Sequence, residues 1–250
     1  MRTKIALRNL YISQAIIIIF LIFAYFTWFP YSFASLGGFT KTAWMLILVD
    51  LVLGPLLVFI VFKEGKKYLK FDINTLLAIQ IGAFLFGAYS LYLKHPAYAV
   101  FNGNGFTLTN VSHLYPQPPW QEQLRTNFFS SPRLVLAKFP EKSSENNSLL
   151  FSIVFNGEPD IDERVKYYEP FEKNIDTIFS RSIKAEKLLS NDEGKERIDA
   201  FIDQHGGVLN DYTFFPLSGN NKKEMIWVFN RDSAQPVGII DSNPRQITER

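Results

Sequence analysis

Three long apolar segments within residues 1–93 constrain this chain more than any other feature. They cover residues 12–29, 42–62 and 75–93. Each is close to the roughly 20 residues that a helix needs to cross a hydrocarbon core about 30 Å thick. Trp and Tyr residues stand near the segment ends, as aromatic side chains do at membrane interfaces. The pattern predicts a membrane protein with a transmembrane domain of three α-helices over residues 1–93.

The basic residues beside these segments predict the orientation of the chain. They gather in the N-terminal segment and in the loop between the second and third apolar runs: Arg2, Lys4, Arg8, Lys63, Lys66, Lys67 and Lys70. The loop between the first and second runs has only Lys41. By the positive-inside rule the N-terminus is cytoplasmic and residues 94–250 lie outside the cytoplasm. An alternative for the first run is a cleaved secretory signal ending at Ser32 to Ala34, although the run is long for a signal.

Residues 94–250 have the composition of an ordinary soluble domain, and their pattern is α+β. Residues 98–111 read as two strands joined by an Asn-Gly turn. Further strands are expected within 133–139, 148–157 and 225–241. Apolar residues at helical spacing predict two helices over 168–204, broken near residues 190–192. We expect a small antiparallel sheet with helices on one face.

The residue pattern gives little support for a catalytic or metal-binding function. The chain has no cysteine, which excludes a disulfide framework, a thiolate nucleophile and a Cys-based metal site. His95, His113 and His205 show no ligand spacing, and a net charge of +2 is too small to indicate nucleic acid. The acidic segment 158–163 could hold Ca²⁺, but a solvated acidic loop is the commoner case. We therefore predict no catalytic, cofactor-binding or metal-binding residues and no cofactor.

Asp50 is an ionisable residue inside the second apolar run, four residues before the pair Gly54-Pro55. A charge at such a position costs about 3 kcal/mol unless it is paired, so the residue is a functional candidate. Three interpretations stay open: a hydrogen bond within the chain, contact with the helix of a second protein, or a role in transport. Depth in the span favours Tyr25 over Gln80 as an internal partner. Gly54-Pro55 is expected to kink its helix. Close helix packing is allowed by small residues of the third run: Ala78, Gly82, Ala83 and Gly87.

Three stretches of the sequence carry a resemblance to a known family. They are "VDLVLGPLLVFIVFKEGKKYLKFD", "HPAYAVFNGNGFTL" and "VFNRDSAQPVGIIDSNP". Their pattern of D-x-x-x-G-P, G-K-K-x-L-K-F-D and P-A-Y-x-V-F-N resembles the TfpX/TfpZ-type pilin accessory proteins of Gram-negative bacteria. The recurrent positions of that family fall here on Asp50, Gly54, Pro55, Gly65, Lys66, Lys67, Lys70, Phe71 and Asp72.

The resemblance implies a protein of the bacterial inner membrane with a periplasmic α+β domain. Its implied role is that of a non-enzymatic, pilin-specific chaperone or assembly factor. The implied partners are a type IV major pilin, inner-membrane lipid and the pilus assembly machinery, with no nucleic acid. Candidate partner-helix contacts are Asp50, Gly54 and Pro55, and candidate cytoplasmic-loop contacts are Lys66, Lys67, Lys70 and Asp72.

Two other classes of protein remain as alternatives. A membrane-anchored periplasmic ligand-binding or sensor protein would need a cytoplasmic output, and the predicted cytoplasmic segments are only about ten residues long. A pilin-modifying enzyme is the third class, although residues 94–250 carry no acidic catalytic motif of convincing form.

Overall fold

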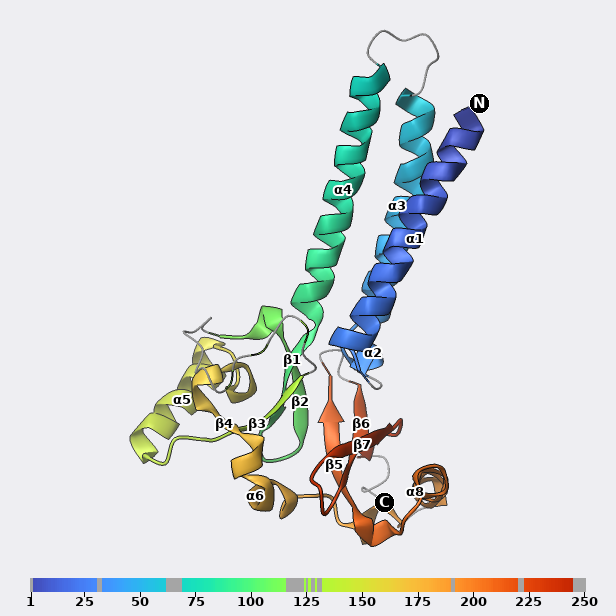
Figure 1. Cartoon of the computed structure of the whole chain (residues 1–250). Coiled ribbons are helices and arrows are strands. Elements are labelled where there is room, and N and C mark those ends of the chain that lie inside the picture. The colour runs from blue at the N-terminus through green and yellow to red at the C-terminus, as the bar shows by residue number, and fades with distance from the viewer. Residues whose placement is uncertain are drawn as a thin grey trace.

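The computed structural model describes residues 2–30, 33–61, 69–115, 124, 126, 129, 132–189, 192–219 and 223–244, with the backbone alone at 2–9, 53–61, 69, 70, 72 and 73. Three long helices lie side by side and project from one side of a sheet domain (Figure 1). They are α1 (Arg2–Trp28), α3 (Phe39–Val61) and α4 (Leu69–Lys94). The N-terminus lies at the end of this bundle that is far from the sheet.

Two of these helices are long and apolar enough to cross a membrane by length and composition. The qualifying stretches are Leu10–Trp28 and Asn74–Lys94. They overlap the predicted spans 12–29 and 75–93, with ends that differ by one or two residues, and both support a membrane anchor. The helix α3 runs between them, but its residues 53–61 are described as backbone alone, so the three-span domain stays a prediction.

Close packing joins the three helices. Phe20 of α1 meets Phe84 of α4 edge to face, with ring centroids 5.4 Å apart. At Gly87 of α4, an added Cβ would lie 2.2 Å from a terminal methyl carbon of Leu46 in α3, so the missing side chain allows these helices to approach. Gly82 has open space around it. Of these two glycines, only Gly87 serves packing within the chain.

The domain that follows α4 is built on a seven-stranded sheet in the order β4-β3-β1-β2-β5-β6-β7. Its strands are β1 (Pro96–Phe101), β2 (Phe106–Asn110), β3 (Arg133–Ala137), β4 (Tyr168–Pro170), β5 (Tyr212–Ser218), β6 (Glu224–Asn230) and β7 (Pro236–Ile240). The predicted hairpin at 98–111 is confirmed as β1 and β2, and the strands within 133–139 and 225–241 are confirmed as β3, β6 and β7.

The sheet is mixed, and the expectation of an antiparallel sheet was wrong. β1 pairs with β3 in parallel, and β2 pairs with β5 in parallel. Both parallel pairings join strands that are far apart in the sequence, which no local turn signal can specify. The strand β5 was not predicted at all.

The segment 148–157 was predicted as a strand and is instead most of helix α5 (Ser143–Asn156). Six of the seven residues from Leu149 to Phe155 are apolar, so their spacing does not separate a strand from a helix. The ending is helical, because Gly157 follows in the left-handed conformation with φ 64°, as residues after helix ends do. Leu149 is buried against the sheet.

The first of the two helices expected over 168–204 is divided. It consists of α6 (Ile175–Phe179) and α7 (Ala185–Leu188), separated where the N–H of Ile183 donates to the carbonyl of Phe214 over 2.8 Å. The second helix is confirmed as α8 (Asp192–His205), and Gly206 follows it with φ 79°.

Helices cover both faces of the sheet, which corrects the expectation of a single covered face. One face carries an aromatic layer made of Phe101, Phe106, Phe171, Phe215, Trp227 and Phe229, against which α6 packs Ile178. On the opposite face α5 packs on β1 and β3, and α8 packs on β5 to β7. Burial of these side chains is the main source of the domain's stability.

The short helix α2 (Phe33–Leu36), between α1 and α3, belongs to the aromatic layer. The ring of Phe33 meets Trp227 edge to face at 5.4 Å. Leu36 lies so close to Gly219 that a Cβ there would be 2.6 Å from the Leu36 carbonyl oxygen. The connection between the first two long helices is therefore part of the sheet domain's core.

Candidate functional site

Asp50 lies near the middle of α3 and faces α1. Ser13 Oγ donates a hydrogen bond to Asp50 Oδ2 over 2.6 Å, and Gln14 Nε2 donates to the same oxygen over 2.9 Å. Two donors on one carboxylate oxygen offset much of the cost of placing this group among apolar helices. The described contacts support the intrachain interpretation of Asp50.

Tyr25 was the wrong internal partner. It lies three residues from the end of α1, whereas Asp50 lies eleven residues from the start of α3. At about 1.5 Å per residue these depths differ by roughly 12 Å. The estimate from sequence placed the start of α3 at residue 42, although the helix begins at Phe39. Tyr25 instead meets Phe26 and Phe39 edge to face.

A small cavity of about 20 Å³ lies beside Asp50, between all three long helices. Gln80 of α4 lines it together with Asp50, and the other lining side chains are apolar: Ile17, Leu46, Val49, Ala83 and Phe84. A space of this size accommodates about one water molecule. Gln80, judged the poorer neighbour from sequence, shares this cavity with Asp50.

The remaining predicted site residues are only partly described. Gly54 and Pro55 lie in α3, which continues as a helix to Val61, so the dipeptide does not end the helix. Lys70 and Asp72 lie in the first turn of α4, without described side chains. Lys66 and Lys67 lie outside the described residues. The proposed contacts of all these residues stay predictions.

Polar and aromatic contacts fix the junction between bundle and sheet. Lys94 Nζ, at the end of α4, donates to Thr42 Oγ1 of α3 over 2.9 Å. The next residue, His95, is buried and stacks on Trp28 of α1 at 5.4 Å. His95 Nδ1 donates to the carbonyl of Tyr92, and burial lowers the pKa of this imidazole against the opposing effect of that bond. The chain then enters β1 directly, so a displacement of α4 would be transmitted to the sheet.

The acidic segment 158–163 is an ordered part of the domain. Arg164, buried to 6% exposure, pairs with Glu158 at 3.0 Å and donates to Ser152 Oγ of α5 and to the Pro159 carbonyl. Asp160 caps the short helix η3 (Ile161–Glu163) by accepting from the Ile161 N–H. These bonds stiffen the segment. Among the residues that the structure describes, no group of three or more His, Cys, Asp or Glu side chains could hold a metal ion.

Shifted pKa values in this part of the domain follow from burial. Burial raises the pKa of Asp162, and the nearby Asp160 carboxylate adds to the effect. Burial raises the pKa of Tyr98 to about 12, and raises that of Tyr168 further. Both hydroxyls donate hydrogen bonds to the backbone: Tyr98 donates to the Leu124 carbonyl and Tyr168 donates to the Asp162 carbonyl. These two hydroxyls therefore have a structural role.

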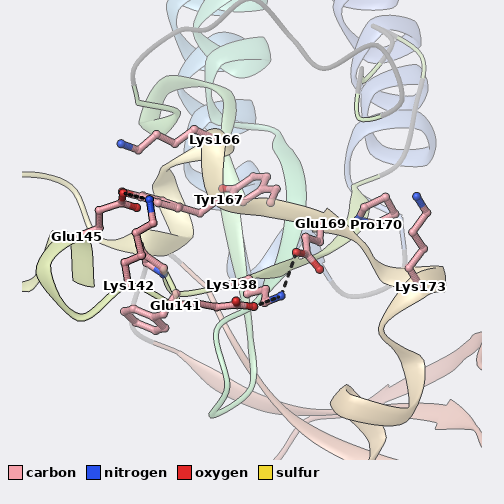
Figure 2. A pocket seen from close by; sticks show the side chains of 12 residues that line it. Lys138, Glu141, Lys142, Glu145, Lys166, Tyr167, Glu169, Pro170 and Lys173 are labelled. Carbon is pink, nitrogen blue, oxygen red and sulfur yellow. Dashed lines mark ion pairs between the residues drawn. The ribbon is translucent and has the colours of Figure 1, made fainter. Parts of the chain in front are cut away.

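A charged groove lies along β4, the outer strand of the sheet, and beside α5 (Figure 2). We call it the α5–β4 groove; its hollow measures about 700 Å³ and is lined by Lys138, Lys142, Glu145, Tyr167, Glu169 and Lys173, among others. A second hollow of about 520 Å³ continues it along α5 and shares Glu145, Lys166 and Tyr167 with it. The sequence did not single out these residues, because surface charges on separate segments give no pattern of their own.

Part of this chain is similar to fimbrial assembly proteins of Dichelobacter nodosus. The protein of serogroup I and that of serogroup E1 are each 32% identical over 79 residues, which is 31% of this chain and 31% of theirs. The protein of serogroups C1 and C2 has the same identity over 79 residues, which is 60% of its length. The matched stretch thus spans less than two thirds of each relative. No family model and no solved structure matches this chain.

Proposed function

We propose that this chain is an inner-membrane accessory protein that stabilises a type IV major pilin and promotes pilus assembly. The observation that carries the proposal is the similarity to proteins named for fimbrial assembly. The resemblance of "VDLVLGPLLVFIVFKEGKKYLKFD" to pilin accessory proteins supports the same role. This resemblance is also the reason for proposing that the role is specific to one pilin.

The arrangement of the chain suits a protein that must meet two parts of one client. In this proposal α1, α3 and α4 span the inner membrane, and the sheet domain lies in the periplasm. A pilin held in that membrane by an apolar helix would place its helix beside the bundle and its head beside the sheet. The junction of Lys94, Thr42, Trp28 and His95 would keep the two contact regions in fixed relation.

The proposed action is chaperoning without a chemical step. Three of the groups with shifted pKa values make structural contacts: Tyr98 and Tyr168 donate to backbone carbonyls, and His95 lies inside the junction. This use of titratable groups favours a structural role over catalysis.

Deleting the gene in its own bacterium tests the proposal against the enzyme alternative. We expect less pilin and fewer surface pili, with the intact mass of the remaining pilin unchanged. A changed pilin mass would indicate a modifying enzyme. Unchanged pilin abundance and unchanged pili would contradict the proposal.

A further inference from the structure

We propose that the α5–β4 groove receives an acidic segment of the pilin head and that the exposed ridge of α5 contacts an apolar side chain beside it. This inference rests on the proposed function and names the surface through which the domain would recognise its client.

Most charges in the α5–β4 groove are paired with each other. Lys138 lies 3.0 Å from Glu141 and 3.6 Å from Glu169, and Lys142 lies 3.6 Å from Glu145. Figure 2 shows these pairs with dashed lines. Two lysines stand against three carboxylates here, so the middle of the groove keeps one excess negative charge, and an acidic segment would be attracted at the ends of the groove and not at its middle.

The two other lysines of the groove, Lys166 and Lys173, form no ion pair with any residue that the structure describes. Figure 2 shows them on opposite sides of the paired charges. Lys166 Nζ lies over the ring of Tyr167, 4.6 Å from its centroid. Two separated ammonium groups that have no carboxylate partner among the described residues fit a ligand with carboxylates at a matching separation.

An apolar ridge on α5 continues from the groove. Phe151, Val154 and Phe155 are 57%, 69% and 72% exposed, and the two rings lie 4.7 Å apart. Phe151 also lines the second hollow, which shares Lys166 with the groove. Adjoining exposed aromatic and aliphatic side chains in a water-facing domain mark an interaction surface.

The walls of the groove are held in place before any partner arrives. Arg164 ties Ser152 of α5 to Glu158 in the lining of the second hollow, and in the groove itself the N–H of Lys138 donates to the Tyr167 carbonyl over 3.0 Å. A preformed surface loses little conformational entropy on binding. The groove is a hollow with ammonium groups at two separated positions. A protein segment could enter this hollow, whereas a flat lipid surface would contact only the rim of the groove.

In vivo photocrosslinking from the full-length chain tests the location. A photoreactive phenylalanine analogue replaces Phe139, an exposed residue of the groove, or Phe155 of the ridge, and a control replaces Val208, which is 61% exposed. We expect pilin adducts from positions 139 and 155 and none from 208. Adducts to lipid alone, or equal pilin adducts from all three positions, would overturn the proposal.

Charge reversal tests the chemistry. In the variant Lys166→Glu/Lys173→Glu, pilin adducts from position 139 should fall at least about fivefold while the chain keeps its abundance. The matched control is Lys184→Glu/Lys195→Glu, which changes the net charge equally at exposed sites by α7 and on α8. Adducts and pilin levels equal to those of the control would overturn the proposal. That result would not contradict the proposed function, provided that deletion of the gene still lowers the abundance of pilin.

Discussion

Removing the carboxylate of Asp50 should weaken the helix bundle by a predictable amount. The side chain accepts hydrogen bonds of 2.6 Å from Ser13 and 2.9 Å from Gln14. Polar contacts between membrane helices contribute about 0.6 kcal/mol on average and reach about 1.7 kcal/mol. Asp50→Leu should therefore lower the free energy of unfolding of the bundle by about 1–3 kcal/mol, a roughly 5- to 150-fold change in the ratio of folded to unfolded chain. Asp50→Asn keeps an acceptor of nearly the same size and should cost under about 1 kcal/mol.

Separation of α1 from α3 in lipid bicelles titrated with dodecyl sulfate would measure this change. The chain has no cysteine, so a donor and an acceptor dye can be attached to one introduced cysteine on each helix without background labelling. Ser90→Ala is the control for Ser13→Ala, because Ser90 Oγ donates to the Phe86 carbonyl of its own helix. A double-mutant cycle of Ser13→Ala with Asp50→Leu should show coupling of about 0.5–1.5 kcal/mol. Zero coupling would refute the contact between Ser13 and Asp50.

The cellular phenotype of Asp50→Leu separates the two main interpretations of this residue. A bundle role predicts that the chain itself becomes scarce. A contact with the pilin helix predicts a normally abundant chain and depleted pilin, with a partial defect in Asp50→Asn. The two hydrogen bonds to α1 lead us to expect the first result.

Three further results are expected. A phosphatase fused after Arg250 should be active and one fused after Lys67 inactive, and the reverse pattern would contradict the proposed topology. Gly87→Val should destabilise the bundle by about 1–3 kcal/mol through overpacking, while Gly82→Val, in open space, should change the dodecyl sulfate midpoint little. Burial lowers the folded-state pKa of His95 below its unfolded value near 6.5, so its contribution to stability is complete above about pH 6.5 and falls as the pH drops toward the folded pKa. The loss of thermal stability between pH 7.5 and 5.5 should be smaller in His95→Asn than in the unaltered chain.

Local signals in the sequence predicted those parts of the fold that depend on neighbouring residues. The Asn-Gly turn at residues 102–105 predicted the β1–β2 hairpin, and the helical spacing of apolar residues predicted α8, which ends at His205. In β5, Pro216 argues against a strand interior, yet β2 pairs with β5 at Leu217 and Ser218, just beyond the proline. Such a pairing depends on residues about a hundred positions apart and leaves no local signal.

The two candidate sites, Asp50 and the α5–β4 groove, also differ in whether a local sequence signal predicts them. Asp50 was identified from its own chemistry, because an acid within an apolar run is costly wherever it stands. Its partners depend on where both α1 and α3 begin and end. The predicted spans 12–29 and 42–62 put Tyr25 close to the level of Asp50, whereas the observed helices place it roughly 12 Å away along the bundle, and Ser13 is a partner. The α5–β4 groove could not be foreseen, because α5 itself had been interpreted as a strand.

The lifetime of newly made pilin tests the central claim most directly. A pulse-chase measurement would compare the bacterium that lacks this gene with the same strain carrying the full-length chain. If the chain stabilises pilin, the half-life of pilin should be several-fold shorter without it and restored by the chain, while pilin synthesis stays the same. An identical pilin half-life in both strains would contradict the account.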